Sequence, residues 1–286
     1  MSNPPLLFDR TAILSRRRRA VRQGAALFLH QEAASELTER LKDINRSFTN
    51  VAVVTGFPDQ WLSFFPDATV FLDDDLLTLE ERSFDLVIHA MCLHQANDPV
   101  GQLVQCQRAL RPDGVFMAAM LGGQTLTELR AALSQAEVEV TGGLSPRISP
   151  MVDIRDAGAL LQRAGFALPV ADADILSVSY ADTAGLMHDL RAMGEANALA
   201  DRNKRTPSRT LFTKLETIYP KTADRVVATF EMLYLTGWAP DPSQQKPLRP
   251  GSATARLADA LQTVEMNEDA VPVITGAGLN DESDTR

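Results

Sequence analysis

The stretch SFDLVIHAMCLHQANDPVGQLVQCQRALRPDGVF, residues 83–116, has the pattern of two parallel strands joined by a helix. Apolar residues dominate 83–91, which predicts a buried strand, and 97–110 has the length and spacing of a helix. The turn RPDG at 111–114 then leads into a second apolar run at 115–121. A helix that crosses between two buried strands is the unit from which parallel sheets are built.

The same alternation continues on both sides of this unit. On the N-terminal side we predict a strand at 51–55, a helix at 58–67 and a strand at 68–72. On the C-terminal side we predict helices at 125–140 and 153–166, a strand at 167–180, a helical insertion at 182–219 and a last strand at 226–238. The fold class is therefore α/β, with a mostly parallel sheet covered on both faces and an antiparallel pair at one edge.

The bulk composition excludes several classes of protein. The 286 residues carry a formal net charge of −9, which argues against a nucleic-acid-binding surface. The two cysteines, Cys92 and Cys106, are too few for a disulfide framework or a metal cluster, so no metal site is predicted. No apolar run is long enough to span a membrane and no secretory signal is visible, so we expect a cytoplasmic protein.

Charge is concentrated near the two ends of the chain. We predict that residues 1–46 form a basic helical arm, with one amphipathic helix over 16–46 that contains most of the run SRRRR at 15–19. A solvated helix face is the first explanation of these arginines, ahead of docking to an acidic protein or a membrane surface, and ahead of nucleic acid. Residues 263–286 are predicted to be a disordered acidic tail, which leaves 47–262 as the folded domain.

Several stretches together resemble a known family. Within 83–116, FDLV, LHQ and RPDG match the second half of class I S-adenosylmethionine-dependent methyltransferases. The segments 120–166 and 186–198, with FDR at 8–10 and LTGW at 235–238, resemble the mitochondrial complex I assembly factors known as protein-arginine hydroxylases, and their alphaproteobacterial relatives. Malonyl-carrier-protein methyltransferases are more distant.

This resemblance covers about residues 8–255. It implies a Rossmann-like methyltransferase fold, S-adenosylmethionine as the family cofactor and a respiratory complex I subunit as a protein partner. It does not identify a catalytic residue, an oligomeric state or a metal.

The loop after the first strand departs from the family pattern. The family has a segment similar to DLGCGRG there, whose acid and glycines admit the cofactor. The corresponding residues here are VVTGFPD at 53–59, so Val53 replaces the acid and Gly56 is the one glycine. Phe57 and Pro58 add bulk, and Pro58 has no backbone N–H. This pattern predicts an eroded S-adenosylmethionine site.

A strand–helix unit of the family is also missing. Residues 56–67 leave room for one short helix before the strand at 68–72. Local similarity matches Asp73 to the acid near the adenine, but if 68–72 lies beside the first strand, Asp73 or Asp74 takes the place of the acid that binds the ribose hydroxyls. Apart from the cofactor, the run Asp73–Asp75 is explained by a solvated loop or by recognition of a cation such as an arginine side chain.

The other candidate site residues follow later strands. His94 lies at the carboxyl edge of the predicted sheet, where α/β proteins bind ligands, and is either a cofactor-site residue or a structural one. Gly122 and Gly123 either end a strand or allow a ligand to approach the backbone. Arg147 and Ser149 lie in the loop GGLSPRISP, where two prolines hold them in place for a substrate or partner.

Polar residues within apolar segments have more ordinary explanations. His89 is predicted to be a buried structural residue, and His30 and His188 to be surface or packing residues on helices. Glu195 and Asn197 either cap a helix or line a cleft.

Three functions remain open at this stage. The first is an assembly or modification factor with an eroded cofactor site, which binds or acts on a respiratory-complex subunit. The alternative is an active S-adenosylmethionine-dependent methyltransferase that acts on a protein or a small molecule, since a fold does not specify a function. The third is a protein-binding relic. Peripheral membrane contact through the basic arm is compatible with any of them.

Overall fold

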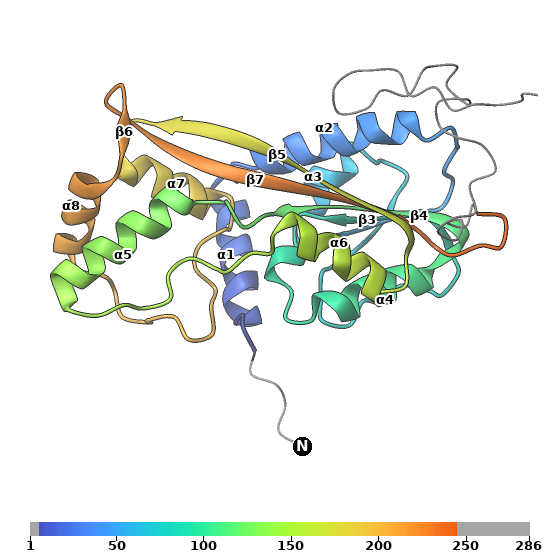
Figure 1. Ribbon diagram of the computed structural model, residues 1–286, viewed down its shortest axis with the longest axis horizontal. Helices are drawn as coiled ribbons and strands as arrows, with labels where there is room; N and C mark the ends of the chain where they lie inside the picture. The colour runs from blue at the N-terminus through green and yellow to red at the C-terminus, as the bar shows by residue number, and fades with distance from the viewer. Residues whose placement is uncertain (1–5, 245–286) are drawn as a thin grey trace, which may run out of the picture. The chain divides into compact units, whose positions relative to one another are not determined.

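The computed structural model describes residues 6–244, which contain the central sheet and the helices on its faces (Figure 1). The helices are α1 (Arg10–Gln23), α2 (Phe28–Asp43), α3 (Pro58–Leu62), α4 (Pro99–Ala109), α5 (Thr127–Thr141), α6 (Ile154–Arg163), α7 (Thr183–Ala192) and α8 (Arg209–Ile218), with a 3-10 turn η1 at Leu93–Gln95. The strands are β1 (Val51–Thr55), β2 (Thr69–Phe71), β3 (Phe84–Ala90), β4 (Leu110–Leu121), β5 (Ala167–Tyr180), β6 (Lys221–Thr222) and β7 (Arg225–Trp238). The predicted tail at 263–286 and the predicted domain end at 262 lie outside the described residues.

The sheet has the order β2-β1-β3-β4-β7-β5, with β6 paired to β7. Strands β1 to β4 pair in parallel, whereas β7 is antiparallel to both β4 and β5. This confirms the α/β class and the predicted antiparallel pair. It also decides the open alternative, because β2 pairs with β1 and Asp73 therefore follows the strand beside β1.

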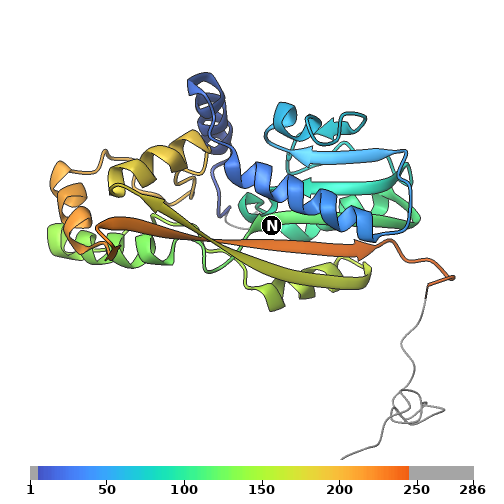
Figure 2. The same ribbon diagram turned by 90° about the horizontal axis from the view of Figure 1, so that it is seen from above.

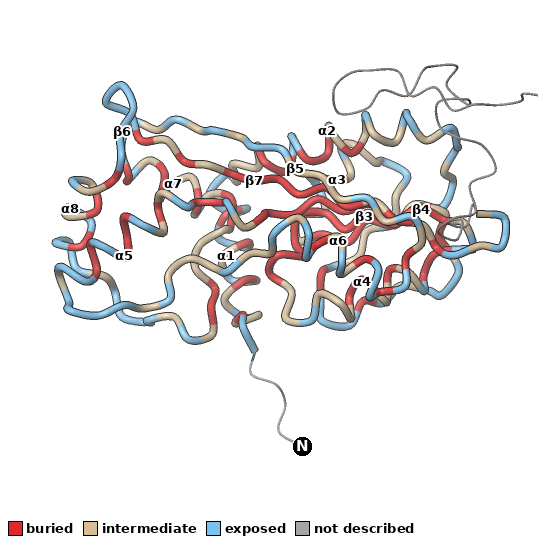
Figure 3. The backbone as a smooth tube through the Cα atoms, in the orientation of Figure 1, coloured by how far each residue is buried: buried red, intermediate tan, exposed pale blue. Residues whose placement is uncertain are grey.

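Alternate strand residues pack into two cores, one on each face of the sheet. Val53 of β1 and Ile88 of β3 join the core that contains residues of α2, α5, α7 and α8. Val54 and Val87 point the other way, into the core that contains residues of α4 and α6. Figures 1 and 2 show α2 and α6 on opposite sides of the sheet, and Figure 3 shows the buried strands between them.

The prediction of one helix over 16–46 is wrong. The chain leaves the helix at Gly24, which has φ 84°, and helix α2 begins four residues later at Phe28. Because the two helices have different directions, the apolar residues of 16–46 do not form one buried face. Leu29 is buried, but Val21 is 59% exposed. Helix α1 instead buries Ile13, Arg17 and Ala20, so the basic segment packs against the rest of the protein.

Three smaller differences have local causes. Helix α3 is shorter than predicted, because Ser63 ends it and the chain turns through Phe64 and Phe65. The turn RPDG lies within the bounds of β4, with Asp113 at φ 60°. The helical insertion is two helices, α7 and α8, and the segment between them carries Glu195 and Asn197. No helix of the described residues is both long and apolar enough to cross a membrane.

Candidate functional site

Most of the predicted site residues lie at the carboxyl ends of the parallel strands. Gly56 follows β1, Asp73 follows β2, His94 lies in η1 after β3, and Gly122 follows β4. Since the carboxyl ends of parallel strands meet at one edge of a sheet, residues far apart in sequence converge there. Open α/β sheets bind their ligands at this edge.

Helix α1 inserts the guanidinium of Arg17 into this edge. Arg17 Nη1 lies 2.8 Å from both carboxylate oxygens of Asp73, and a Cβ placed on Gly56 would be 2.2 Å from the same nitrogen. Arg10, about two turns earlier on the same face of α1, adds bonds of 3.0 and 2.9 Å to the same carboxylate. The chain itself therefore fills the space over Gly56.

The interaction of α1 with Asp73 is buried and stable. Burial alone would raise the pKa of Asp73, but hydrogen bonds from Arg10 and the charge of Arg17 outweigh it, and the pKa is lowered. Asp74 is exposed and pairs with Arg10 at 3.1 Å. The prediction that the arginines form a solvated face is wrong for Arg17, and the guanidinium groups that the aspartates bind belong to this chain.

A chain of hydrogen bonds leads from Arg17 to a second acid. Arg17 Nη2 donates to Gln95 Oε1 at 3.0 Å, and Gln95 Nε2 donates to Glu195 Oε2 at 2.6 Å. His94 Nδ1 accepts from the backbone N–H of Leu121 at 3.5 Å, which assigns the proton of the neutral ring to Nε2, 3.4 Å from the same Glu195 oxygen. Oxygen Oε1 of Glu195 accepts no hydrogen bond within residues 6–244.

Glu195 is held as a carboxylate. Burial would raise its pKa, but its interactions with His94, followed by the charge of Arg17, lower it below the ordinary value. The structure therefore answers the alternative left open for Glu195: it lines a cavity and does not cap a helix.

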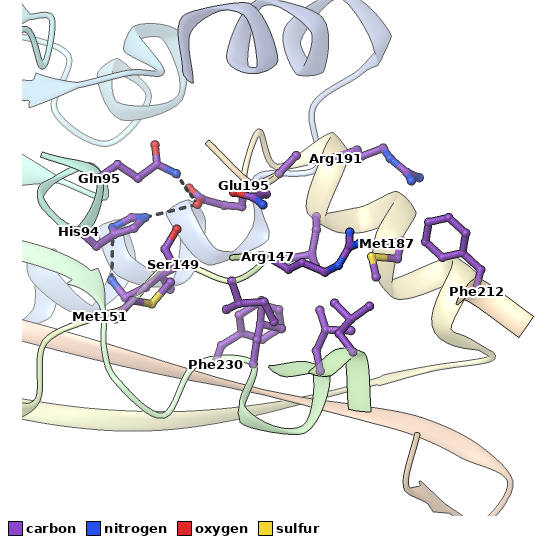
Figure 4. Close-up of a pocket in the computed structure, with 18 residues that line it drawn as sticks. His94, Gln95, Arg147, Ser149, Met151, Met187, Arg191, Glu195, Phe212 and Phe230 are labelled. Atoms are coloured by element: carbon purple, nitrogen blue, oxygen red, sulfur yellow. Dashed lines mark hydrogen bonds and ion pairs between the residues drawn. The ribbon is translucent and has the colours of Figure 1, made fainter. Parts of the chain in front are cut away.

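The cavity encloses about 190 Å³ beside this acid. In Figure 4, Gln95, His94, Glu195 and Ser149 gather at one end, Arg191 and Phe212 lie at the other, and Arg147 lies between them. The walls are mostly apolar: Leu121, Leu126, Leu129, Leu133, Ile148, Met151, Met187, Leu190, Phe212 and Phe230. The arrangement is a polar inner end, an apolar channel and a cationic mouth.

The proline loop at 142–150 forms one wall of this cavity. Glu137 of α5 anchors it by accepting hydrogen bonds from Arg147 Nη2 at 2.5 Å and from Ser145 Oγ at 2.6 Å. Asn197 Nδ2 donates to the carbonyl of Pro146 at 2.8 Å and ties the loop to the segment after α7. Glu137 thus neutralises the charge of Arg147. Arg147 and Ser149 line the cavity, and their role in binding a substrate or partner stays a prediction.

The paired glycines serve the packing of β7. A Cβ on Gly122 would lie 2.5 Å from Glu231 Oε2 and 2.8 Å from Leu233 Cγ, and the Gly122 N–H donates to the Glu231 carbonyl. Gly123 donates to the carbonyl of Val152 at 2.9 Å. Neither glycine lines the cavity. The close approach at Gly122 is to side chains of β7, whereas a Cβ on Gly123 would make ordinary contacts with Met151 and Val152.

Comparisons with known proteins agree with the fold and the motifs. A family model described as "Methyltransferase domain" matches residues 32–118. Human "Arginine-hydroxylase NDUFAF5, mitochondrial" is 34% identical over 88% of this chain and 83% of its own length. The zebrafish (Danio rerio) protein of the same name is 36% identical over 82% of this chain and 75% of its own. This chain belongs to the NDUFAF5 family. 

Proteins named as methyltransferases match over a shorter stretch or at lower identity. A malonyl-[acyl-carrier protein] O-methyltransferase from Methylovorus is 35% identical, but over 60% of this chain and 56% of its own. The solved 1,6-didemethyltoxoflavin-N1-methyltransferase of Burkholderia thailandensis aligns with 84% of this chain and 94% of its own at 14% identity and a TM-score of 0.41.

The sequence did not single out several residues of this NDUFAF5-family site. Arg17 was hidden in an arginine run, although its spacing from Ile13 and Ala20 places it on the buried stripe of α1. Met187 and Arg191 of α7 lie in the family-like segment 186–198 but were given no role there, and Phe212 of α8 carried no motif. Within residues 6–244, no three His, Cys, Asp or Glu side chains form a group that could hold a metal ion.

The other histidines have the structural roles expected of them. His89 Nε2 lies 2.9 Å from Gln102 Oε1, and burial lowers the pKa of His89 to about 4. His30 is buried, accepts a hydrogen bond from Trp61 Nε1 at 3.0 Å and has its pKa lowered by burial to about 3. His188 is exposed.

Proposed function

We propose that this chain binds an arginine side chain of a respiratory-complex subunit in the cavity beside Glu195, without using S-adenosylmethionine in the usual pose of the fold. The observation that carries the proposal is the position of Arg17. Its guanidinium takes the space over Gly56 and both oxygens of Asp73, while the neighbouring cavity stays open. The arginine comes from the name of the relatives.

The residues at the ends of β1 and β2 do not fit the cofactor in that pose. Val53 replaces the usual acid and is buried in the core, and Pro58 at the start of α3 removes a backbone donor. Asp73 and Asp74 follow the strand beside β1, where the family has its ribose-binding acid, but Arg10 and Arg17 hold Asp73, and Arg10 also pairs with Asp74. Binding would require α1 to leave this edge.

The cavity suits a cationic group on an aliphatic stem. Glu195 supplies a negative charge and a free oxygen at the inner end, and a guanidinium is a good donor to a carboxylate. The apolar walls suit the methylene groups of the stem. Arg147 does not oppose the ligand strongly, because Glu137 neutralises it.

Binding of this side chain serves two roles equally well. The relatives are named arginine-hydroxylases, and hydroxylation of the bound arginine, with dioxygen as oxidant and two electrons from an external reductant, would make the chain a modifying factor. Binding alone would make it a scaffold during assembly of the complex. In either role the partner is a protein.

Calorimetry on the purified chain tests the proposal. We expect no heat of binding from S-adenosylmethionine or S-adenosylhomocysteine at millimolar concentration, and saturable binding of Nα-acetyl-arginine amide. Glu195→Gln should abolish binding of the amide, whereas Glu139→Gln, which changes a carboxylate outside the cavity, should not. The arginine site would be refuted if both variants still bound the amide, or if wild-type protein did not bind it.

Active methyl transfer is the alternative, and one observation favours it. An open groove lined by Leu14, Arg18 and Val21 of α1, and by Leu72 and Asp73, runs beside Gly56. A shift of α1 would widen this groove into the family's cofactor site. Micromolar binding of S-adenosylmethionine in the same calorimetric experiment would establish that route and overturn the proposal.

Two further expectations remain proposals. Contact with a membrane or an acidic protein would use the exposed arginines Arg18, Arg19 and Arg22, and a pull-down of respiratory-complex subunits with and without charge reversal at these residues tests it. The cytoplasmic location expected from the sequence is likewise untested; the animal relatives are mitochondrial by name.

A further inference from the structure

We propose that the peptide that carries the arginine leaves the cavity along a groove between α7 and α8, and that Arg191 pairs there with an acidic side chain of the same peptide. The inference rests on the proposed arginine cavity and adds a second subsite that determines which peptides bind. Its occupant is an extended segment of a protein partner.

The groove joins the mouth of the cavity. Three residues, Met187, Arg191 and Phe212, line both hollows. Beyond them the groove is lined by Thr183, Thr213 and Thr217. The exposed Thr213 and Thr217 hydroxyls donate to carbonyl groups of α8, so they meet a peptide as acceptors for its backbone N–H groups, while the buried Thr183 hydroxyl donates to Glu216. In Figure 4, Met187, Arg191 and Phe212 lie at the opposite end of the cavity from Glu195.

Arg191 is the cation that remains available at this junction. Its side chain is exposed and forms no ion pair within residues 6–244, in contrast to Arg147, which Glu137 holds at 2.5 Å. An unpaired cation beside a groove favours a ligand with a carboxylate at that point.

The acids nearest to Arg191 on α7 and α8 are engaged elsewhere. Glu216 accepts from Thr183 and from Lys221 Nζ at 2.6 Å, and Asp182 caps α7 by accepting from the Gly185 N–H at 2.7 Å. Asp189 accepts from the Tyr180 hydroxyl at 2.8 Å. These acids have other partners, and Glu195 lies at the opposite end of the cavity, so the mouth leaves Arg191 free to pair with a carboxylate of a bound peptide.

An extended peptide fits this surface better than a compact ligand. The inner end offers a carboxylate for a cationic head, and the mouth offers an unpaired cation, so the ligand carries opposite charges at its two ends. Phe212 is 37% exposed at the junction, and with the flexible Met187 it provides an apolar contact for the chain between those charges.

Fluorescence anisotropy with synthetic peptides tests the inference. The probes are labelled nonapeptides with one central arginine, in which a single Asp, Asn or Lys is moved through the three positions on either side. We expect one position at which Asp binds wild-type protein about three to five times more tightly than Asn at low salt. This preference should vanish at about 1 M salt, where the screening length is short.

A charge reversal identifies the residue responsible. Arg191→Asp should reverse the preference, so that Lys binds more tightly than Asn at the same position. The matched control is Arg163→Asp, which makes the same charge change on the exposed face of α6 and should retain the Asp preference. The measured quantity is the ratio of affinities within one variant, which a general loss of binding does not mimic.

The outcomes separate this inference from the proposed function. Arginine peptides that bind without an Asp preference at any position overturn the second subsite and leave the arginine cavity intact. A preference that survives Arg191→Asp, or that Arg163→Asp also removes, overturns the assignment to Arg191. Absence of binding by both the peptides and Nα-acetyl-arginine amide overturns the proposed function, and the second subsite with it.

Discussion

Replacing Arg17 by methionine should destabilise the protein far more than any other change in the arginine run. The variant keeps an unbranched stem but loses the guanidinium, which makes two bonds of 2.8 Å to Asp73 and one of 3.0 Å to Gln95. Removal of one partner from a buried ion pair costs about 3–5 kcal/mol. Because Arg10 keeps its own bonds to Asp73, we expect the lower end, about 3 kcal/mol of the free energy of unfolding.

Urea denaturation followed by tryptophan fluorescence measures this loss of stability. Trp61 is a suitable reporter, because it is buried in the folded protein and bonded to His30, and unfolding exposes it. Arg18→Met is the matched control: it makes the same chemical change at the next residue, which is exposed, and should cost less than about 0.5 kcal/mol. The double variant Arg17→Met/Asp73→Asn should be less destabilised than the sum of its parts, because the two side chains interact directly.

The pH dependence of the loss follows from the lowered pKa of Asp73. A carboxylate with a depressed pKa in the folded state contributes stability above its unfolded value of 3.8, and that contribution disappears as the pH falls through the folded pKa. The free energy of unfolding should therefore differ most between wild type and Arg17→Met at pH 7, and this difference should shrink below about pH 4. Equal losses in the Arg17 and Arg18 variants, or strict additivity of the pair, would refute a buried Arg17–Asp73 interaction.

Three further changes have defined outcomes. Gly122→Ala should cost about 1–3 kcal/mol, since its Cβ would meet Leu233 Cγ at 2.8 Å, whereas Gly143→Ala, with open space around it, should be near neutral in the same urea titration; equal effects would disprove the close approach. In the folded state the pKa values of His30 and His89 are about 3 and 4, so the unfolded state takes up protons first as the pH falls. The free energy of unfolding should therefore fall by roughly 2 kcal/mol per histidine between pH 7 and 5. A stability that does not change over this pH range would contradict their burial as neutral rings. Glu137→Gln should speed tryptic cleavage after Arg147 several-fold relative to Glu139→Gln, because Glu137 anchors that loop; unchanged cleavage would show that the anchor is dispensable.

Local sequence determined the elements that surround the site. The five residues of β1 were predicted without error, because a short apolar run between turn residues has few other structures. Helices were predicted over 97–110 and 153–166, and the structure has α4 and α6 there, with α4 beginning at Pro99 after the cap Asp98 and α6 after the cap Asp153. Each of these signals acts within a few residues of the element that it defines.

The same local information placed some site residues correctly and left others undecided. His94 was expected at the carboxyl edge of the sheet because it follows β3, and it is there. Arg147 and Ser149 were noticed because packing did not explain them, and both line the cavity. Whether Asp73 follows the strand beside β1 was undecidable, since strand order depends on pairing and not on the order of elements along the chain.

The sequence by itself determined the α/β class, the family and the loss of the usual acid and glycines after β1. Only the tertiary structure decided what replaced them. Arg17 meets Asp73 across 56 residues and Gln95 across 78, and Gln95 meets Glu195 across 100. A charged side chain in an arginine run has no local sequence signal that marks it as buried. Burial of Arg17 is tolerated because the carboxylate that follows β2 lies against it. That contact exists only once the sheet and α1 have come together.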